Sequence, residues 1–194
     1  DLEKADLTNS ADLTPYFMIG YNTKENLLYL ALWVRDDSLV VGMDWSSTDA
    51  CEVYVEGKHS GKKILPSSYP SRHAEFSEPD IPGLPLQYSG VPGKGRYGGN
   101  IKGNPGLFSG DIEKTHTKMA YSRKDDVTIY EWAIEVFDNY PGVSTRLVAG
   151  KTIGFDVVAV DKDTGTDTTA WICWAPFGGA KYANADLLGN LTLI

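Results

Sequence analysis

Residues 44–57, DWSSTDACEVYVEG, contain the strand that decides the fold. Apolar and polar residues alternate along it with the period of a β-strand: Cys51, Val53 and Val55 on one face, and Glu52, Tyr54 and Glu56 on the other. An isolated tryptophan, Trp45, precedes the strand. The acidic face has two explanations. It is either the solvated face of an antiparallel sheet, or a binding face on which carboxylates accept hydrogen bonds beside the flat indole.

Seven other segments have strand character, and helical periodicity is nearly absent. They are residues 15–22, 26–36, 116–123, 127–137, 152–163, 168–177 and 189–194. Many short strands separated by turn-forming residues are typical of an all-β sandwich or a flattened barrel. We predict a single domain over residues 1–194, an antiparallel, jelly-roll-like β-sandwich of about nine to eleven strands with Cys51 in its core.

The composition narrows the choice of partners. Of the 194 residues, 42% are hydrophobic and 23% are charged, which is ordinary for a folded domain. The net charge of −8 argues against nucleic-acid binding, and no apolar run reaches the roughly 18 residues of a membrane-spanning helix. The sequence begins at Asp1 without a methionine or a signal segment, so we expect a mature chain or an excised domain.

One long segment, about residues 58–115, interrupts the strand pattern with glycines and prolines. Its most biased part is IPGLPLQYSGVPGKGRYGGNIKGNPGLFSG, residues 81–110. We expect a loop-rich insertion, because an excursion of this length without secondary structure is uncommon inside a compact domain and is often functional. It either forms a wall of a binding site or is a passive insertion. The GxGxxG pattern at 93–98 lies in a stretch flanked by proline and further glycines, which is typical of a loop, so we do not interpret it as a dinucleotide site.

No arrangement of residues predicts catalysis. The sequence has no GxSxG elbow and no His–Cys or His–Asp pair in a recognisable context. Carboxylates four residues apart, such as Glu52 with Glu56 and Glu131 with Glu135, share one face of a strand. Such pairs occur in glycoside hydrolases, but a solvated sheet face explains them better. No sequence pattern therefore identifies a catalytic site.

Residues 161–167, DKDTGTD, place acids at alternate positions around a glycine. This pattern resembles the first half of a calcium loop, because Ca²⁺ needs several oxygens that converge on one point. The closing glutamate and the flanking helices of an EF-hand are missing, and a hairpin turn also explains the glycine. Any metal here is expected to be a structural Ca²⁺ held by Asp161, Asp163 and Asp167.

The aromatic residues fall into two groups. Those in apolar patterns are expected in the core, namely Trp33, Trp132 and one of Trp171 and Trp174. Trp45 and Tyr182 instead lie in the polar stretches DWSST and AKYANAD, where no hydrophobic pattern explains them. Exposed rings beside acids and amides suit a sugar, whose C–H face stacks on a ring while its hydroxyls bind polar side chains.

Five motifs in this order resemble the family 9 carbohydrate-binding modules and the wider DOMON-like sandwich group. They are LLYLALWVRDDSL (27–39), W-x-x-x-D-x-C-E-V-Y-V (45–55), IYEWAIEV (129–136), GKTIGFDVVAVDKDTG (150–165) and ICWAPFGGAKYANADLLGNLTLI (172–194). The resemblance covers most of the chain outside residues 58–115. Its most specific parts are Leu188-Gly189-Asn190-Leu191 and Asp49-Ala50-Cys51-Glu52.

The resemblance implies a non-catalytic sugar-binding module with bound calcium, usually attached to a secreted glycan-degrading enzyme. The expected ligand is an oligo- or polysaccharide, and the expected location is extracellular or periplasmic. The family's two clamping rings correspond to Trp45 and Tyr182, and its sugar-binding glutamate corresponds to Glu52. The family's usual arginine is missing, so Arg72, Arg96 and Arg123 are candidates to replace it. Our predicted ligand set adds Arg96 and Tyr97 from the insertion.

Two other functions remain open on sequence grounds. One is a structural or interaction module of a larger secreted enzyme, which keeps the fold without a ligand. The other is a haem-binding electron-transfer domain, as in some DOMON-like sandwiches. Its candidate haem ligands are Met18, Met43, Met119, His59, His73 and His116. None of these residues has a distinctive sequence context.

Overall fold

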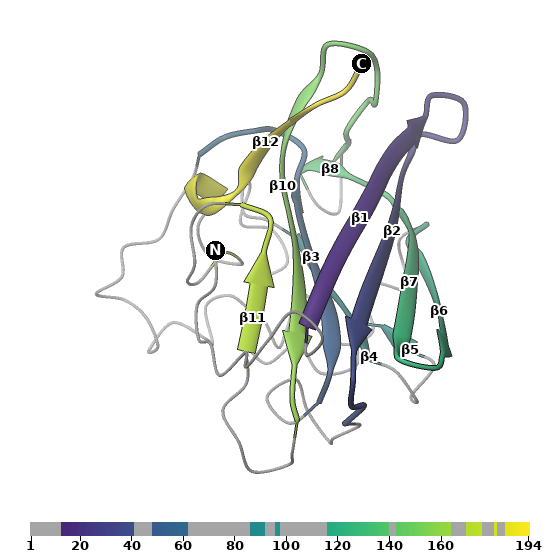
Figure 1. Cartoon of the computed structure of the whole chain (residues 1–194). Helices are drawn as coiled ribbons and strands as arrows, with labels where there is room; N and C mark the ends of the chain where they lie inside the picture. The colour runs from purple at the N-terminus through teal and green to yellow at the C-terminus, as the bar shows by residue number, and fades with distance from the viewer. Residues whose placement is uncertain are drawn as a thin grey trace.

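The computed structural model describes residues 13–40, 48–61, 86–91, 96–97, 116–139, 143–163, 170–175, 181 and 185–194. For residues 86–91, 96–97 and 139 the description covers the backbone. Figure 1 shows two sheets arranged as layers. Strands β1 (Leu13–Asn22) and β2 (Leu27–Asp36) of one sheet lie beside β10 (Thr152–Asp161) and β3 (Ala50–Glu56) of the other.

The first layer is a four-stranded antiparallel sheet in the order β1-β2-β7-β6. Its strands are β1 (Leu13–Asn22), β2 (Leu27–Asp36), β6 (Lys118–Lys124) and β7 (Val127–Ile134). Two hairpins, β1–β2 and β6–β7, build this sheet, and β2 joins them by pairing with β7. The strands end where the sequence has its turn residues.

The second layer is a six-stranded sheet whose path runs β11-β10-β3-β4-β5, with β12 also paired to β10. Its strands are β3 (Ala50–Glu56), β4 (Leu86–Val91), β5 (Arg96–Tyr97), β10 (Thr152–Asp161), β11 (Ala170–Cys173) and β12 (Gly189–Thr192). A separate small pair consists of β8 (Phe137–Asn139) and β9 (Val143–Ser144), and a 3₁₀ helix, η6, spans Ala185–Leu187. No helix in the described ranges is long and apolar enough to cross a membrane.

The core lies between the two sheets and follows the alternation of the strands. Every second residue of β2, from Leu28 to Val34, is buried there, and Trp132 and Phe155 come from β7 and β10. Cys51 has no exposed surface and belongs to this cluster, which confirms its predicted place. The all-β, antiparallel sandwich predicted from the sequence is confirmed.

Two expectations about the tryptophans are wrong. Trp33 is half-buried on the outward face of β2, because its neighbours Leu32 and Val34 occupy the inward positions. It stacks there on Tyr16 with a ring-centroid distance of 5.1 Å and an angle of 2°. Neither Trp171 nor Trp174 is fully buried; the latter is 42% exposed and packs its ring against Phe155.

The insertion contributes strands that the sequence did not predict. Strands β4 and β5 lie within residues 58–115 and extend the six-stranded sheet from β3. With β9 they bring the described strands to twelve, beyond the predicted nine to eleven. The reason is that β5 and β9 have two residues each, too few to show a period, and a glycine interrupts the apolar pattern of β4.

Candidate functional site

The predicted acidic face of β3 is buried, so the solvated-face explanation is wrong. All seven residues of β3 are buried, on both faces of the strand. Glu52 is 7% exposed and Glu56 is 2% exposed. Strand β3 is central in its sheet, with β10 on one side and β4 on the other. Buried carboxylates need hydrogen bonds or counter-charges, and the structure supplies them.

Glu52 is held by a neighbour on its own strand. The hydroxyl of Tyr54 donates a hydrogen bond of 2.7 Å to Oε2 of Glu52. Burial raises the pKa of Tyr54 well above its usual value, and the carboxylate of Glu52 raises it further. The phenol therefore stays protonated and remains a donor. This fixes the orientation of the carboxylate that is predicted to bind the sugar.

A buried ion pair lies next to this pair of residues. Asp156 of β10 is in register with Tyr54, and its Oδ2 binds Nζ of Lys181. The side chains of Asp156 and Lys181 are almost completely buried. Oδ1 of Asp156 accepts hydrogen bonds from the backbone N–H of Val157 at 2.9 Å and of Ala175 at 2.7 Å. Burial raises the pKa of Asp156, whereas the ammonium of Lys181 acts in the opposite direction.

The Asp156 carboxylate therefore joins two points of the chain that flank residues 176–180. Ala175 is held through its N–H and Lys181 through its ammonium. Lys181 directly precedes Tyr182, the second predicted clamping ring. Tyr182 lies outside the described residues. Its neighbour in sequence is nevertheless anchored on the same face of the sheet as Glu52, because Asp156 and Tyr54 are register partners.

Trp45 also lies outside the described residues, but the ends of its segment are placed. The N–H of Asp49 donates to the carbonyl of Val40 at 2.8 Å, and the N–H of Val40 donates to Oδ2 of Asp49 at 2.5 Å. Thr48 adds a hydrogen bond from its hydroxyl to the same carbonyl at 3.1 Å. Val40 and Thr48, which flank residues 41–47, therefore lie side by side, and Thr48 is followed within two residues by β3.

The two predicted insertion residues, Arg96 and Tyr97, form the short strand β5. Tyr97 is in register with Gly90 of β4, which is in register with Cys51. Their backbone is therefore two strands away from the strand that carries Glu52. The description of these two residues ends with their backbone, so their part in a ligand site stays a prediction.

Three buried aspartates meet where β2 and β10 end and β3 begins. The ligand atoms of Asp36, Asp49 and Asp161 all lie within 4.8 Å of one another, so the group could hold a metal ion. Burial raises the pKa of Asp36 to about 6 and that of Asp49 to about 8. For both, neighbouring carboxylates add to the rise. Such a cluster of hard oxygen ligands suits Ca²⁺.

The sequence predicted one of these three aspartates as a metal ligand. Asp161 was predicted, whereas Asp36 and Asp49 were not, because they are remote from it in sequence. Asp163, also predicted, is exposed and accepts a hydrogen bond from the hydroxyl of Ser38 at 3.4 Å. Asp167 lies outside the described residues. An aspartate at the end of a strand, or directly before the start of one, was the available signal for the two missed residues.

The described histidines of the haem hypothesis contact other side chains. Nε2 of His59 lies 2.8 Å from Oδ1 of Asn190. Nδ1 of His116 lies 3.2 Å from Oε2 of Glu135. Met43 and His73 lie outside the described residues. No observation favours haem over the other functions.

Comparison with known proteins gives a family and a fold. A sequence model described as carbohydrate family 9 binding domain-like matches residues 94–194, just over half of the chain. A family 9 carbohydrate-binding module from Caldicellulosiruptor kristjanssonii, solved in complex with glucose, has a TM-score of 0.65 at 16% identity. That match covers 100% of this chain and 80% of the other.

A second structure from the same organism supports the same fold. It is a family 9 module in complex with cellotriose, with a TM-score of 0.65 and 15% identity over 99% of this chain and 78% of the other. No curated protein sequence matches the chain. The chain belongs to the carbohydrate family 9 binding domain-like family, whose members are non-catalytic binding modules.

Proposed function

We propose that this module binds a neutral oligo- or polysaccharide at the outward face of the six-stranded sheet. Trp45 and Tyr182 stack on the two faces of a terminal sugar, and Glu52 accepts hydrogen bonds from its hydroxyls. Family membership supports the ligand class, as do the relatives solved with glucose and cellotriose. The chain then acts as a targeting module, attached to a catalytic domain in a longer secreted protein.

The observation that carries the proposal is the arrangement around Glu52. Its carboxylate is oriented by Tyr54, and Tyr54 is in register with Asp156. Asp156 anchors Lys181, which immediately precedes Tyr182. The chain that leaves the Trp45 segment enters the same strand as Glu52. Glu52 and Tyr54 of β3 thus share one sheet face with the Asp156–Lys181 pair, which supports a sugar clamp on this face.

The chemistry suits a carbohydrate. An aromatic ring offers a flat apolar surface to sugar C–H groups, and an ionised carboxylate makes shorter and stronger hydrogen bonds than a neutral acceptor. Because Glu52 is mostly buried, it would reach the ligand through its small exposed edge. A ligand of one or two sugars has few atoms and sheds bound water, so the affinity should be modest.

We expect Trp45→Ala to weaken binding to all sugars that the protein recognises. Loss of one stacking surface should raise the Kd by about tenfold or more, equivalent to ~1.4 kcal/mol. Glu52→Gln should instead change the preference among sugars, because an amide donates where the carboxylate accepts. Calorimetry with glucose, cellotriose and matched xylo- and manno-oligosaccharides measures both effects.

Glu56→Gln is the matched control for Glu52→Gln. Glu56 lies on the same face of the same strand, but its carboxylate accepts from the backbone N–H of Lys58 and Ser60. It should change stability and leave sugar preference unaltered. If the wild-type protein binds sugars and Trp45→Ala binds them equally well, the clamp is wrong. If no sugar binds, the structural-module alternative takes its place.

We also propose that Asp36, Asp49 and Asp161 bind a structural Ca²⁺. Three carboxylates that repel one another in a buried place are stabilised by a divalent cation. Arg123 lies 3.7 Å from Asp36 and offsets part of the charge already. When bound, the ion would tie the ends of β2 and β10 to the start of β3. Asp49 also closes the segment that carries Trp45, so the ion would steady one wall of the sugar site.

Removal of Ca²⁺ by EDTA should lower the melting temperature. An ion at one hundred times its Kd stabilises the folded state by about 2.7 kcal/mol, since the unfolded chain lacks the site. Ligand carboxylates must be deprotonated, so with Asp49 at a pKa of about 8 the gain should be larger at pH 8 than at pH 5. Calorimetric melts with and without EDTA at both pH values measure this.

Variants of single aspartates locate the ion. Asp161→Ala should abolish the sensitivity to EDTA, whereas Asp37→Asn, an exposed acid beside the cluster, should preserve it. Asp163→Ala distinguishes a site built from Asp36, Asp49 and Asp161 from the loop site predicted from the sequence, which includes Asp163. If it also abolishes the sensitivity, the 161–167 loop predicted from the sequence contributes a ligand. An unchanged melt of the wild-type protein in EDTA contradicts the calcium proposal.

A further inference from the structure

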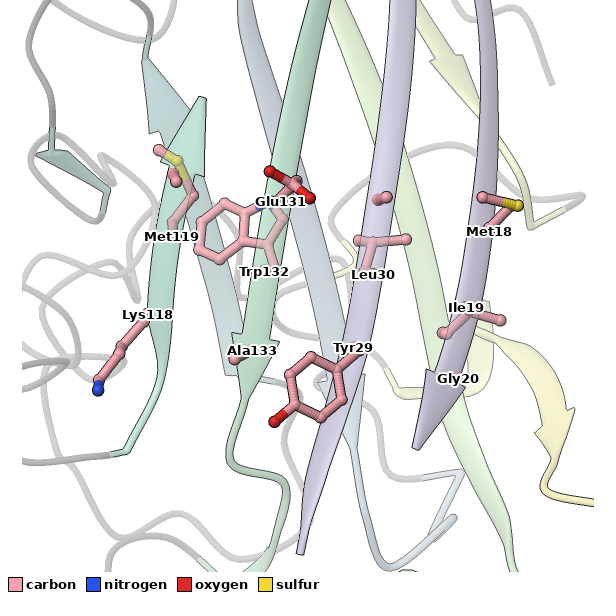
Figure 2. A pocket seen from close by; sticks show the side chains of 12 residues that line it. Met18, Ile19, Gly20, Tyr29, Leu30, Lys118, Met119, Glu131, Trp132 and Ala133 are labelled. Carbon is pink, nitrogen blue, oxygen red and sulfur yellow. The ribbon is translucent and has the colours of Figure 1, made fainter. Parts of the chain in front are cut away.

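A groove of about 740 Å³ crosses the outward face of the four-stranded sheet (Figure 2). All four strands of this sheet, β1, β2, β7 and β6, contribute to its lining. Glu52 lies on the outward face of the other sheet, because its neighbours Cys51 and Val53 point into the core. The groove therefore lies on the opposite side of the sandwich from the proposed sugar clamp.

Small residues form the floor of the groove, and they are poor choices for an exposed strand. They are Gly20, Ala31, Ala120 and Ala133, one from each strand. Glycine and alanine are depleted in strands, and an interior glycine loses more backbone entropy on folding than any other residue. These small side chains leave a depression in the outward face of the sheet, and they reduce the stability of the folded protein.

The fold itself does not require a glycine at position 20. A Cβ atom added there would meet nothing within 4 Å, and Gly20 is not among the described residues with a positive φ. Neither a turn nor a close packing contact among the described residues therefore explains this glycine. A glycine in a strand often marks a place where a ligand approaches the backbone closely.

Larger side chains rise beside this floor, and one of them is fixed in place. Tyr29 is 39% exposed, and its hydroxyl donates a hydrogen bond to Oε2 of Glu25. The same oxygen accepts a hydrogen bond from Nδ2 of Asn22 at 3.1 Å, so the β1–β2 turn holds the ring. Figure 2 shows Glu131 on β7, the strand next to that of Tyr29, and Lys118 on β6, the strand beyond it. The groove thus combines an oriented ring with a hydrogen-bond acceptor and a donor.

The apolar surface continues along β1 and β2. Tyr16 is 60% exposed and stacks on Trp33 next to the groove residues Met18 and Ala31. Strand spacing makes the sheet about 14 Å wide between its outer strands. That width accommodates a short extended oligosaccharide lying across the strands.

We infer that this groove is a second carbohydrate site, which takes the interior of an extended, neutral glycan chain. The ligand class rests on the proposed function, whereas the site rests on the groove itself. Ring and methyl groups suit sugar C–H faces, and Glu131 and Lys118 suit hydroxyls while their charges offset each other. If a second copy of the protein packed the same face against this one, the groove would remain as a cavity between the two sheets. Unfilled cavities are unfavourable. A thin chain fills the groove.

The test titrates the protein with cellohexaose, xylohexaose and mannohexaose by calorimetry and by NMR of assigned backbone amides. We expect two binding events with one of these probes, and shifts at residues 18–20, 29–31, 118–120 and 131–133. Gly20→Thr should fill the floor without loss of stability, because the space is open and threonine favours strands. It should remove the second event or weaken it about tenfold, as should Tyr29→Ala.

Variants of the clamp separate this inference from the proposed function. Trp45→Ala should leave the groove event and its NMR shifts unchanged. If Trp45→Ala abolishes all binding and Gly20→Thr abolishes none, the groove inference is overturned and the clamp stands. The absence of shifts at the groove with all three probes also overturns it. Shifts there that depend on protein concentration without sugar would identify a dimer interface instead and overturn it equally.

Discussion

Lys181→Met should lower the free energy of unfolding by about 3–5 kcal/mol, the usual cost of removing one partner from a buried ion pair. The substitution keeps most of the side-chain volume but leaves the carboxylate of Asp156 in a place with no exposed surface. Two backbone N–H groups, of Val157 and Ala175, would then be its remaining partners among the described contacts. Urea unfolding at neutral pH measures the loss.

The loss should depend on pH in a defined direction. Burial already raises the pKa of Asp156, and removal of the ammonium should raise it further. The protonated acid is then favoured in the folded state. The deficit should be small below about pH 4, the usual pKa of an aspartate in the unfolded chain. It should grow as the pH rises through the raised pKa of the folded state.

Two further variants test this cause. Asp156→Asn combined with Lys181→Met removes both charges and should recover much of the lost stability. Arg35→Met removes a partner of Asp126 from an exposed pair, 57% and 40% exposed with a distance of 2.6 Å. Surface pairs contribute about 0–1 kcal/mol, so this variant should unfold almost like the wild type. Equal losses in Arg35→Met and Lys181→Met would contradict the role of burial.

Gly57→Ala should destabilise the protein by about 3 kcal/mol, the upper part of the usual range for overpacking a core. Gly57 directly follows β3, and its N–H donates to the carbonyl of Phe137 at 3.1 Å. A Cβ there would lie 1.7 Å from Oγ1 of Thr145 and 2.7 Å from the same carbonyl oxygen. Both distances are too short for van der Waals contact, so the backbone must move.

Thr145 cannot easily give way. It is fully buried, its N–H donates to the carbonyl of Val136 at 2.7 Å, and its hydroxyl donates to Asp138 at 2.9 Å. Gly20→Ala is the matched control, since a Cβ at that position meets nothing within 4 Å. It should be neutral or slightly stabilising. Thermal melts of the two variants compare them, and a melt of Gly57→Ala like that of the wild type would refute the steric argument.

Much of the fold could be predicted from the sequence because the relevant signal is local. A period of two identified β1, β2, β3, β6, β7, β10, β11 and β12 to within a few residues. The same period placed Cys51 with Val53 and Val55 in the core. Of the predicted site residues, Glu52 was assigned to the correct strand face, because alternation determines which residues share a face.

The tertiary structure alone decided what covers each face and which distant residues meet. Alternation does not show that both faces of β3 are buried, so a solvated face remained one of two explanations for Glu52. It likewise could not show that the outward position of Trp33 is shared with Tyr16.

The Asp36–Asp49–Asp161 group and the Asp156–Lys181 pair join parts of the chain separated by whole strands. These contacts arise from the order in which strands pair. That order depends on burial of the whole core and leaves no mark in the local pattern of residues.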